Sequence, residues 1–304
     1  MRKLCGVIVP VATPLLRDES PDESAIGTLV EYLLSAGVHG LFANGSMGGF
    51  AFHSDAAQDT IIAAVCRAAR SRVPVLAGVS DTSVRRVLDR IRRLKGLPLD
   101  AVVVLPPYYF HYSPGETTRF FAAIADQAHL PIVLYENPRH VPLNTITAGV
   151  LAELVKHPNI AGIKNSSSDD AQWRTFLDLD LPRERFSLIC GAEKRMGDGL
   201  RAGFDGLTGG FHNVLPELPV AMYQAAQRQD WDLVRHLQLR LNRAYGIFET
   251  AGGWRGLEVA FQFLGIATKA AVHPFDDSVS TEQRNQIEAI LAMEKNQGAT
   301  QCFS

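Results

Sequence analysis

Short runs of apolar residues recur eight times along the first two thirds of the chain. They occupy residues 6–11, 40–43, 75–79, 101–105, 132–135, 161–164, 187–190 and 206–208. Each run is nearly continuous in apolar character instead of alternating, which is typical of parallel strands buried on both faces. Segments with apolar residues at helical spacing separate the runs. Eight strand–helix repeats, with no Gly-rich dinucleotide fingerprint after the first strand, favour an α/β fold of the closed (β/α)8 TIM-barrel type over a doubly wound sheet.

Several helix ends are marked by capping residues. Ser20 as N-cap, Pro21 at the first helical position and Glu23 reaching back predict a capping box. Gly37 follows the same apolar segment and predicts a left-handed helix end. The capping pattern recurs at residues 113–116, which read Ser-Pro-Gly-Glu. These signals support alternation of helices with the strands.

The pattern changes after the eighth run. Helical spacing of apolar residues extends over residues 215–248 and returns at 257–264 and 281–293. This is more helix than one barrel repeat needs. We therefore expect a catalytic (β/α)8 barrel over residues 1–214 and a C-terminal helical bundle over residues 215–304, with a bend at Gly252 and Gly253.

The balance of charge indicates a small-molecule partner. Among 304 residues, 30 basic and 32 acidic side chains give a net charge of −2, which provides no long-range field to attract nucleic acid or an anionic membrane. Basic residues do gather at positions 85–95. Apolar residues recur there at helical spacing, so the pattern favours a surface helix with a solvated basic face over a nucleic-acid patch.

The cysteines and the N-terminus indicate an unexported protein. Cys5, Cys66, Cys190 and Cys302 show no C-x-x-C spacing, which argues against a structural zinc site and a disulfide framework. The apolar run near the N-terminus is too short for a signal peptide, and no stretch approaches the ~18 apolar residues of a membrane span. We expect a cytoplasmic protein that contacts neither membrane nor nucleic acid.

The ends of the predicted strands are where a barrel of this kind places its reactive groups. Lys164 ends an apolar strand, where a charged ammonium is costly. Burial favours the neutral amine, which can attack a ketone carbonyl and form an imine. The alternative is a lysine that has cleared the barrel and reaches solvent or a structural ion pair.

Tyr135 ends the preceding strand and is followed by Glu136. Adjacent parallel strands lie about 4.8 Å apart, so residues at the same height can place a phenol beside an amine, where it can transfer protons. Tyr135 can equally be a packing residue. Glu136 is a further candidate acid or base, although a carboxylate after a strand end more often fixes a loop.

Two glycine-rich turns could bind an anion. The turn Gly45-Ser46-Met47 follows the second strand, and its backbone N–H groups and the serine hydroxyl could hold a carboxylate. The segment around Thr208 follows the eighth strand, where many barrels bind phosphate. Both segments can also be simple turns, so neither is decisive alone.

Taken together, five segments resemble the dihydrodipicolinate synthase and N-acetylneuraminate lyase family of class I pyruvate-dependent aldolases and dehydratases. They lie at strand ends and occur in the family's order. The segments are residues 6–14, 45–49, 107–109, 135–138 and 162–166. The resemblance covers essentially the whole chain.

The resemblance implies that Lys164 forms a Schiff base with pyruvate or another 2-oxo acid and that Tyr135 transfers protons to and from it. It also implies that Ser46 and the backbone of Met47 bind the substrate carboxylate, and that Tyr109 reaches the site across a subunit contact. No metal or organic cofactor is implied. The family commonly assembles as a homotetramer, which we expect here.

Departures from the family pattern concern the substrate. Met47 stands where the family usually has a second hydroxyl residue, and a thioether cannot relay protons. Arg139, followed by His140, lies one position out of register from the arginine with which synthases bind a semialdehyde carboxylate. Lysine biosynthesis is therefore disfavoured. We expect a catabolic aldolase or dehydratase that acts on a sugar-acid-like 2-oxo acid, or on an aromatic one because Phe50 adds apolar surface near Met47.

Other functions stay open at this point. One is dihydrodipicolinate synthase itself. Another is a non-catalytic homologue that kept the scaffold to bind small molecules, since fold alone does not confer function. A third is a barrel enzyme that binds phosphorylated sugars through the loop after the eighth strand. The chemistry of the residues at the strand ends distinguishes among them.

Overall fold

The computed structural model describes residues 3–276 and 278–301, and Cys302 lies outside them. Eight parallel strands form a closed barrel in chain order. The strands are β1 (Gly6–Pro10), β2 (Gly40–Ala43), β3 (Val75–Gly78), β4 (Ala101–Val104), β5 (Ile132–Glu136), β6 (Ile160–Asn165), β7 (Ser187–Cys190) and β8 (Gly206–Leu207). Every strand end that differs from the predicted one does so by a single residue. The predicted TIM barrel is confirmed.

The barrel strands are buried along their whole length, which explains their continuous apolar character. Side chains that point outward join one large core with the surrounding helices. Side chains that point inward, including Phe42 on β2, Tyr135 on β5 and Ile189 on β7, form a second cluster inside the barrel. The barrel interior is therefore a packed core, with the reactive groups at its C-terminal mouth.

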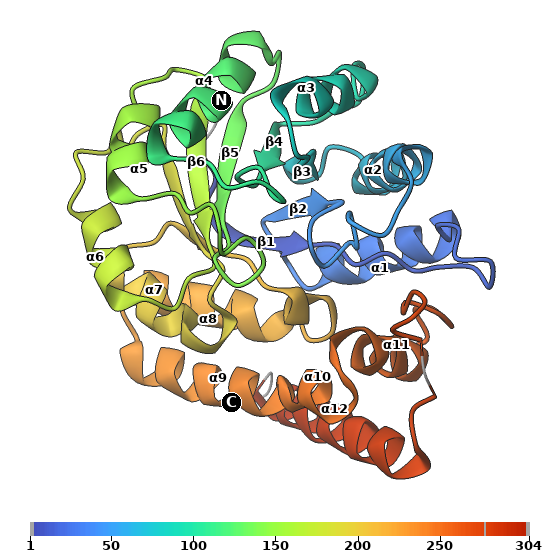
Figure 1. The fold of residues 1–304 in the computed structure, drawn as a ribbon. Helices are drawn as coiled ribbons and strands as arrows, with labels where there is room; N and C mark the ends of the chain where they lie inside the picture. Colours follow the sequence, from blue (N-terminus) through green and yellow to red (C-terminus); the bar gives the residue numbers. More distant parts are fainter. Residues whose placement is uncertain (1–2, 277, 302–304) are drawn as a thin grey trace.

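Helices surround the barrel in a ring, as Figure 1 shows. They are α1 (Glu23–Ser35), α2 (Asp55–Ala69), α3 (Val84–Arg93), α4 (Pro114–Gln127), α5 (Ala148–Leu154), α6 (Asp170–Leu177) and α7 (Met196–Ala202), followed by α8 (Glu217–Gln227). Two 3-10 turns lie in the loops after β7 and β8, η1 (Glu193–Arg195) and η2 (Gly210–Asn213).

The predicted start of the first helix is wrong. Asp22, not Ser20, is the N-cap of α1, and its carboxylate accepts a hydrogen bond from the Ala25 N–H. Ser20 instead donates to Asp18, and Pro21 forms an isolated bridge with Leu15. The aspartate competes successfully because it is an equally good cap two residues closer to the helix.

The other predicted helix signals are confirmed. Ser113 and Glu116 form the reciprocal capping box of α4. Gly37 has a φ of 81° just after α1, a conformation that glycine adopts without a steric penalty. On α3, Val87, Leu88 and Ile91 are buried, as the helical spacing predicts.

One basic residue of α3 departs from the predicted solvated face. The Arg90 side chain is only 11% exposed and pairs with Asp81, whose side chain is 4% exposed. Arg90 also donates to the side-chain oxygen of Gln58 on α2. Arg86 pairs with Asp81 from the exposed side of the helix. The basic residues of α3 thus fasten α2, α3 and the loop after β3 to one another.

Four further helices follow α8: α9 (Trp231–Ala244), α10 (Gly246–Ala251), α11 (Gly253–Leu264) and α12 (Thr281–Gln301). Gly252 separates α10 from α11 with a φ of 79°, which confirms the predicted bend. Arg240 on α9 and Glu294 on α12 form a buried ion pair with an Nε–Oε2 distance of 2.8 Å. The domain division near residue 215 stays a prediction; α8 itself packs against β1 and β8.

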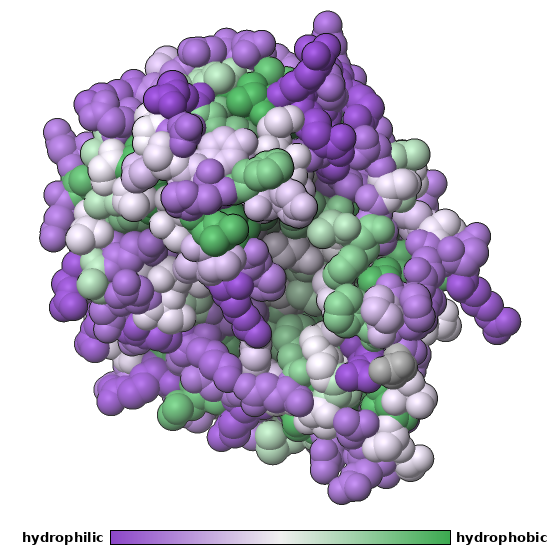
Figure 2. Space-filling model, viewed as in Figure 1, coloured by the Kyte–Doolittle hydropathy of each residue, from purple (hydrophilic) through white to green (hydrophobic). Residues whose placement is uncertain are grey.

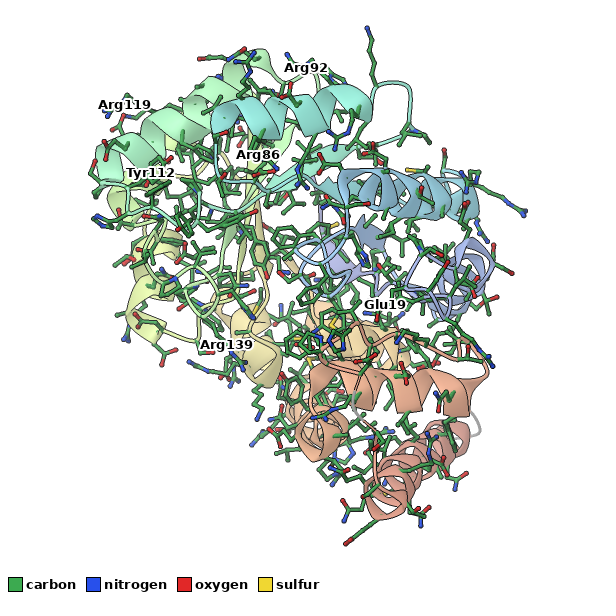
Figure 3. All side chains as sticks on the ribbon, turned by 45° about the vertical axis from the view of Figure 1, so that its right-hand side comes forward. Glu19, Arg86, Arg92, Tyr112, Arg119 and Arg139 are labelled. Carbon is green, nitrogen blue, oxygen red and sulfur yellow. The ribbon has the colours of Figure 1, made fainter. Side chains whose placement is uncertain are left out.

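The segment after α11 is fastened to the loop between β1 and α1. The Glu19 carboxylate accepts a hydrogen bond from the His273 N–H and lies 3.5 Å from Lys269 Nζ. Figure 3 shows Glu19 where that loop meets the C-terminal helices. In the part of the chain that the structure describes, no helix combines the length and apolar character required of a membrane span.

Candidate active site

Lys164 and Tyr135 lie side by side at the mouth of the barrel. They are register partners on β6 and β5. Both side chains are buried, at 7% and 5% exposure. Lys164 Nζ lies 4.0 Å from the centroid of the Tyr135 ring and 5.3 Å from that of Phe42. No ion pair joins Lys164 to a carboxylate among residues 3–276 and 278–301, and this buried amine lies against aromatic rings instead.

The residue after β7 leaves room for this lysine because it is a glycine, Gly191. A Cβ on Gly191 would lie 3.2 Å from Lys164 Cε and would overlap the Ser166 hydroxyl. Any larger residue would push both side chains away from the mouth of the barrel. Gly191 is therefore a steric requirement of the site.

The phenol of Tyr135 lies among polar groups. Burial by itself raises the pKa of Tyr135, but the charge of Lys164 and hydrogen bonds with Ser46, Lys164 and Ser166 outweigh it and bring the pKa below its usual value. The Asn137 amide nitrogen also donates to the phenolic oxygen, at 2.9 Å. A phenol with a lowered pKa exchanges protons readily with a neighbouring amine.

The turn after β2 places Ser46 beside this phenol. It starts at Asn44, which has a φ of 55°, and the close approach of its carbonyl to β3 excludes a Cβ on Gly78. The Asn44 amide donates to Gly78 O and to Gln58 Oε1, and the Gln58 amide donates to the carbonyls of Phe50 and His53. The glycine-rich turn is thus a fixed element of the site.

Met47 reaches from this turn to the loop after β8. A Cβ on Gly210 would overlap the Met47 sulfur, so the thioether fills space that a larger residue would occupy. Phe50 follows Met47 and makes an edge contact with Tyr108, at 6.5 Å between ring centroids. Figure 2 shows a hollow at this mouth, with hydrophobic residues gathered on the side of the β2 loop.

The loops after β7 and β8 supply polar groups. The Thr208 hydroxyl and His212 Nδ1 are buried and have no hydrogen-bond partner among the described residues. Glu193 accepts a hydrogen bond from the Phe211 N–H. Burial raises the pKa of Glu193, and this N–H group and the charge of Lys164 oppose the rise. An acceptor and a free hydroxyl therefore lie in the loops after β7 and β8, near the end of the Met47 side chain.

Arg139 lies at the rim of the site, as Figure 3 shows. Its side chain is exposed and acts electrostatically on His140, Lys194 and Tyr245. Lys194 forms an ion pair with Glu249 on α10. The rim between the β5 loop and the C-terminal helices therefore carries the Arg139 charge beside an ion pair.

Tyr109 lies away from Lys164 within its own chain. Its side chain is 79% exposed and packs edge-on against the exposed Phe110. Its backbone has a φ of 85°. A positive φ in an aromatic residue is strained, and such strain occurs most often where function requires it. Within one chain the structure does not bring Tyr109 to the site.

Glu136 faces away from Lys164, behind the strands. It is fully buried and accepts hydrogen bonds from the Ile146 N–H and the Gln172 amide. Burial raises the pKa of this carboxyl to about 7. Gln172 in turn accepts from Asn165 at the end of β6. Glu136 therefore ties the end of β5 to the loops around it.

The structure brings Lys164, Tyr135 and Ser46 together, as their strand-end positions predict. Thr208 and Met47 lie at the same mouth, and Gly45 belongs to the turn. Sequence reasoning missed four polar residues of the site, each within five residues of a strand end. They are Asn137, Ser166, Glu193 and His212.

Comparisons with known proteins show the family of this chain. The sequence model of the Dihydrodipicolinate synthetase family matches residues 3–294. A 4-hydroxy-tetrahydrodipicolinate synthase of Methanospirillum hungatei JF-1 is 29% identical over 289 residues, which are 94% of this chain and 98% of that protein. A probable 2-dehydro-3-deoxy-D-pentonate aldolase of Escherichia coli K12 is 26% identical over 293 residues, which are 96% and 97% of the two chains.

Solved structures show the same architecture. A protein of the dihydrodipicolinic acid synthase family from Escherichia coli K12, crystallised with pyruvate, superposes with a TM-score of 0.88. Its sequence is 25% identical, and the match covers 96% of this chain and 99% of that one. The likeness extends through the barrel and the C-terminal helices alike.

Proposed function

The chain belongs to the dihydrodipicolinate synthetase family and is a lyase, and from this premise we propose that it is a Schiff-base aldolase or dehydratase acting on pyruvate or another 2-oxo acid. One observation carries the proposal. The Lys164 amine is buried at the barrel mouth, has no carboxylate partner within the described residues, and lies against the Tyr135 ring. A structural relative crystallised with pyruvate supports the same substrate class.

In this mechanism the neutral Lys164 amine attacks the ketone carbon of the 2-oxo acid. The carbonyl oxygen takes one proton from the attacking nitrogen, which gives the carbinolamine, and a second from Tyr135, after which it leaves as water and a protonated imine remains. Tyr135 supplies and removes these protons, since its phenol has a lowered pKa and lies beside the amine. Burial of the pair excludes bulk water, which would otherwise compete for the same protons.

The protonated imine then accepts an electron pair from the neighbouring bond. In aldol cleavage this is the C3–C4 bond: the C4 hydroxyl gives its proton to the ionised Tyr135 phenol and leaves as an aldehyde, while the bond electrons form an enamine. In dehydration, loss of a C3 proton to the same base forms the enamine, which expels the C4 hydroxyl as it takes that proton and leaves as water. The enamine or the imine is hydrolysed in the final step and frees Lys164.

The turn after β2 is suited to hold the substrate carboxylate. Ser46 presents a hydroxyl beside Tyr135, and the backbone of Gly45 and Met47 runs through the same turn. The unpartnered hydroxyl of Thr208 is a further donor at this mouth. A carboxylate bound here would hold the ketone carbon near Lys164.

The remainder of the substrate meets both polar and apolar groups. Glu193 and Thr208, in the loops after β7 and β8, offer an acceptor and a hydroxyl, with Arg139 farther out. Met47 and Phe50, after β2, offer an apolar surface. We infer a catabolic sugar-acid-like 2-oxo acid as the preferred substrate, as the name of the Escherichia coli aldolase relative supports. An aromatic 2-oxo acid is the second candidate, because it would pack on the apolar surface.

Synthase activity is the alternative within the family, and the name of the Methanospirillum relative favours it. Met47 argues against it here, because its thioether cannot pass a proton from Tyr135 onward. The exposed pair of Tyr109 and Phe110 suits burial against a second copy of the chain. We infer a homotetramer in which Tyr109 contributes to a neighbouring site.

A cleavage assay tests the proposal. Aldol cleavage of a 2-dehydro-3-deoxy sugar acid releases pyruvate, which lactate dehydrogenase reports through oxidation of the reduced nicotinamide cofactor. We expect pyruvate release by the native protein and none by the Lys164→Ala variant. Full activity in Lys164→Ala would end the proposal. Faster condensation of pyruvate with an amino-acid semialdehyde than cleavage of any sugar acid would assign the synthase alternative instead.

A further inference from the structure

The hydrogen bond between Asn137 and Tyr135 restricts the phenol. The Asn137 amide nitrogen lies 2.9 Å from the phenolic oxygen, and both side chains are 5% exposed. An amide nitrogen carries hydrogens and no acceptor site, so the phenolic oxygen must accept this bond. The phenolic hydrogen therefore points away from Asn137.

The other neighbours of the phenol lie where that hydrogen can go. Ser46, Ser166 and Lys164 all form hydrogen bonds with the phenol. A serine hydroxyl or a neutral amine can accept a proton from it. Asn137 thus directs the phenolic hydrogen toward the reacting amine and the residue proposed to hold the carboxylate.

The amide itself is fixed by His140. Asn137 Oδ1 lies 3.2 Å from His140 Nδ1. Because an amide oxygen only accepts, His140 Nδ1 must carry the hydrogen. A flipped amide would instead accept the phenolic hydrogen, and His140 would need the other tautomer to accept from the amide nitrogen. The tautomer with a hydrogen on His140 Nδ1 therefore matches the amide orientation that donates to the phenol.

The backbone around Asn137 reinforces this arrangement. Its carbonyl accepts hydrogen bonds from the N–H groups of His140, at 3.1 Å, and Val141, at 2.9 Å. Val141 is buried with the cluster inside the barrel, so the turn is anchored to the same core as Tyr135. The three side chains form one connected polar unit at the end of β5.

We infer that Asn137 is a positioning residue that orients the Tyr135 phenol for proton transfer with Lys164, and that His140 holds Asn137 in place. The inference rests on the proposed function for its catalytic meaning. A neutral side chain at 137 without an N–H would let the hydroxyl rotate and would leave the phenolate without this donor. The charged groups that act on the unit are Lys164 on β6 and Arg139 beside His140.

Substitutions at position 137 test the orientation. Asn137→Leu keeps the approximate volume and removes the donor. Asn137→Asp keeps the shape and replaces the donor with an acceptor, which draws the phenolic hydrogen away from Lys164. We expect each variant to raise the Tyr135 pKa by about one unit and to slow imine formation about tenfold at neutral pH, with little change in KM.

Two readouts separate this role from a structural one. Ultraviolet titration of each variant against its Tyr135→Phe counterpart isolates the ionisation of this one phenol. Stopped-flow measurement of imine formation across pH gives the rate. His140→Gln keeps an N–H for Asn137 and should behave almost as the native protein, whereas His140→Leu should shift both readouts partway.

Asn159→Leu is the matched control. Asn159 directly precedes β6, donates to three backbone carbonyls and does not contact the phenol. It should lower stability without moving the Tyr135 pKa. Should Asn137→Leu fail to fold, Asn137→Asp gives the same test. An unchanged Tyr135 pKa and pH profile in the position 137 variants would overturn the inference. Absence of any imine at Lys164 would contradict the proposed function but not the inference about Asn137, which the titration of Tyr135 still tests.

Discussion

Lys164 and Tyr135 are chemically useful because neighbouring strands present them at the same height. Each residue is ordinary alone, since lysines often snorkel and tyrosines often pack. Together, an amine 4.0 Å from the centroid of a phenol ring can exchange protons within one buried site. The pair therefore depends on the register between β5 and β6, which is given by backbone pairing along the two strands.

Substitution of Tyr135 by phenylalanine isolates the hydroxyl. The ring remains to pack against Lys164, while proton transfer is lost. We expect kcat to fall about 10²-fold or more, with the fold intact by circular dichroism. A loss below about tenfold would demote Tyr135 to a packing residue.

The sequence identified Lys164, Tyr135 and Ser46 because a barrel places reactive groups at strand ends, and those positions can be read from the apolar runs. It did not identify Asn137 or Glu193. Their roles depend on how a loop turns back over the mouth, and Asn137 contacts a side chain only two positions before it. Such a turn is determined by tertiary contacts rather than by local propensity.

At the scale of elements, the ends of β5 and β6 are joined by a buried polar network behind the site. Glu136, Gln172 and Asn165 are its members. Register partners Glu136 and Asn165 directly follow Tyr135 and Lys164. The network holds the two catalytic strands together without facing the substrate.

This network makes stability depend on pH. Glu136 has a pKa of about 7 in the folded state against 4.5 for an ordinary glutamate, so the folded state binds its proton more tightly. The stability that this proton contributes is fully present below pH 4.5 and is lost as the pH rises through 7. The resulting decrease in the free energy of unfolding is about 3 kcal/mol at most. In Glu136→Gln this dependence should vanish from urea-unfolding free energies measured between pH 4.5 and 8.

The pH dependence of the unfolding free energy of Glu136→Gln should be subtracted from that of the native protein. His212 has a pKa lowered to about 3 by burial and by the charge of Lys164, and it therefore destabilises the fold in acid, opposite to Glu136. Glu153→Gln, on an exposed glutamate of α5, is the matched control. Parallel curves for the native protein and Glu136→Gln would contradict the assigned pKa.

The strands could be predicted to within one residue because continuous apolar runs have few alternative structures. The start of α1 could not. Pro21 is engaged in a bridge with Leu15, and Glu19 binds the segment after α11, more than 240 residues away in sequence. Capping rules rank Ser20 and Asp22 about equally and take no account of these contacts.

At the scale of the whole molecule, α12 is fastened to α9 by a buried charge pair. Arg240 and Glu294 are 3% and 2% exposed, and the guanidinium also donates to the Glu294 backbone carbonyl. Glu294→Leu leaves a buried cation without its partner. We expect a loss of about 3–5 kcal/mol in the free energy of unfolding, measured with urea.

A double variant distinguishes a lost partner from lost packing. Arg240→Met combined with Glu294→Leu removes both charges and should recover most of the lost stability. No recovery in the double variant would mean that the pair stabilises the bundle through its shape. Neither residue lies at the barrel mouth, so imine formation should be unchanged in the folded fraction.

The assembly of subunits and the rim of the site are the features that the sequence of one chain predicts least well. Exposed aromatic residues such as Tyr109 signal a partner surface, and the sequence alone does not reveal their exposure. The long C-terminal helices were recognisable from their spacing, yet their attachment through Glu294 and Glu19 depends on the folded barrel.

The most direct test of the account is reduction with borohydride in the presence of pyruvate, followed by peptide mass mapping. A Schiff base on Lys164 would be reduced to a stable secondary amine. The account predicts one pyruvate adduct per chain, located on Lys164 and absent from Lys164→Ala, with exposed lysines such as Lys194 unmodified. No adduct in folded protein with pyruvate or a panel of 2-oxo acids would contradict it and would favour a homologue that binds small molecules without catalysis.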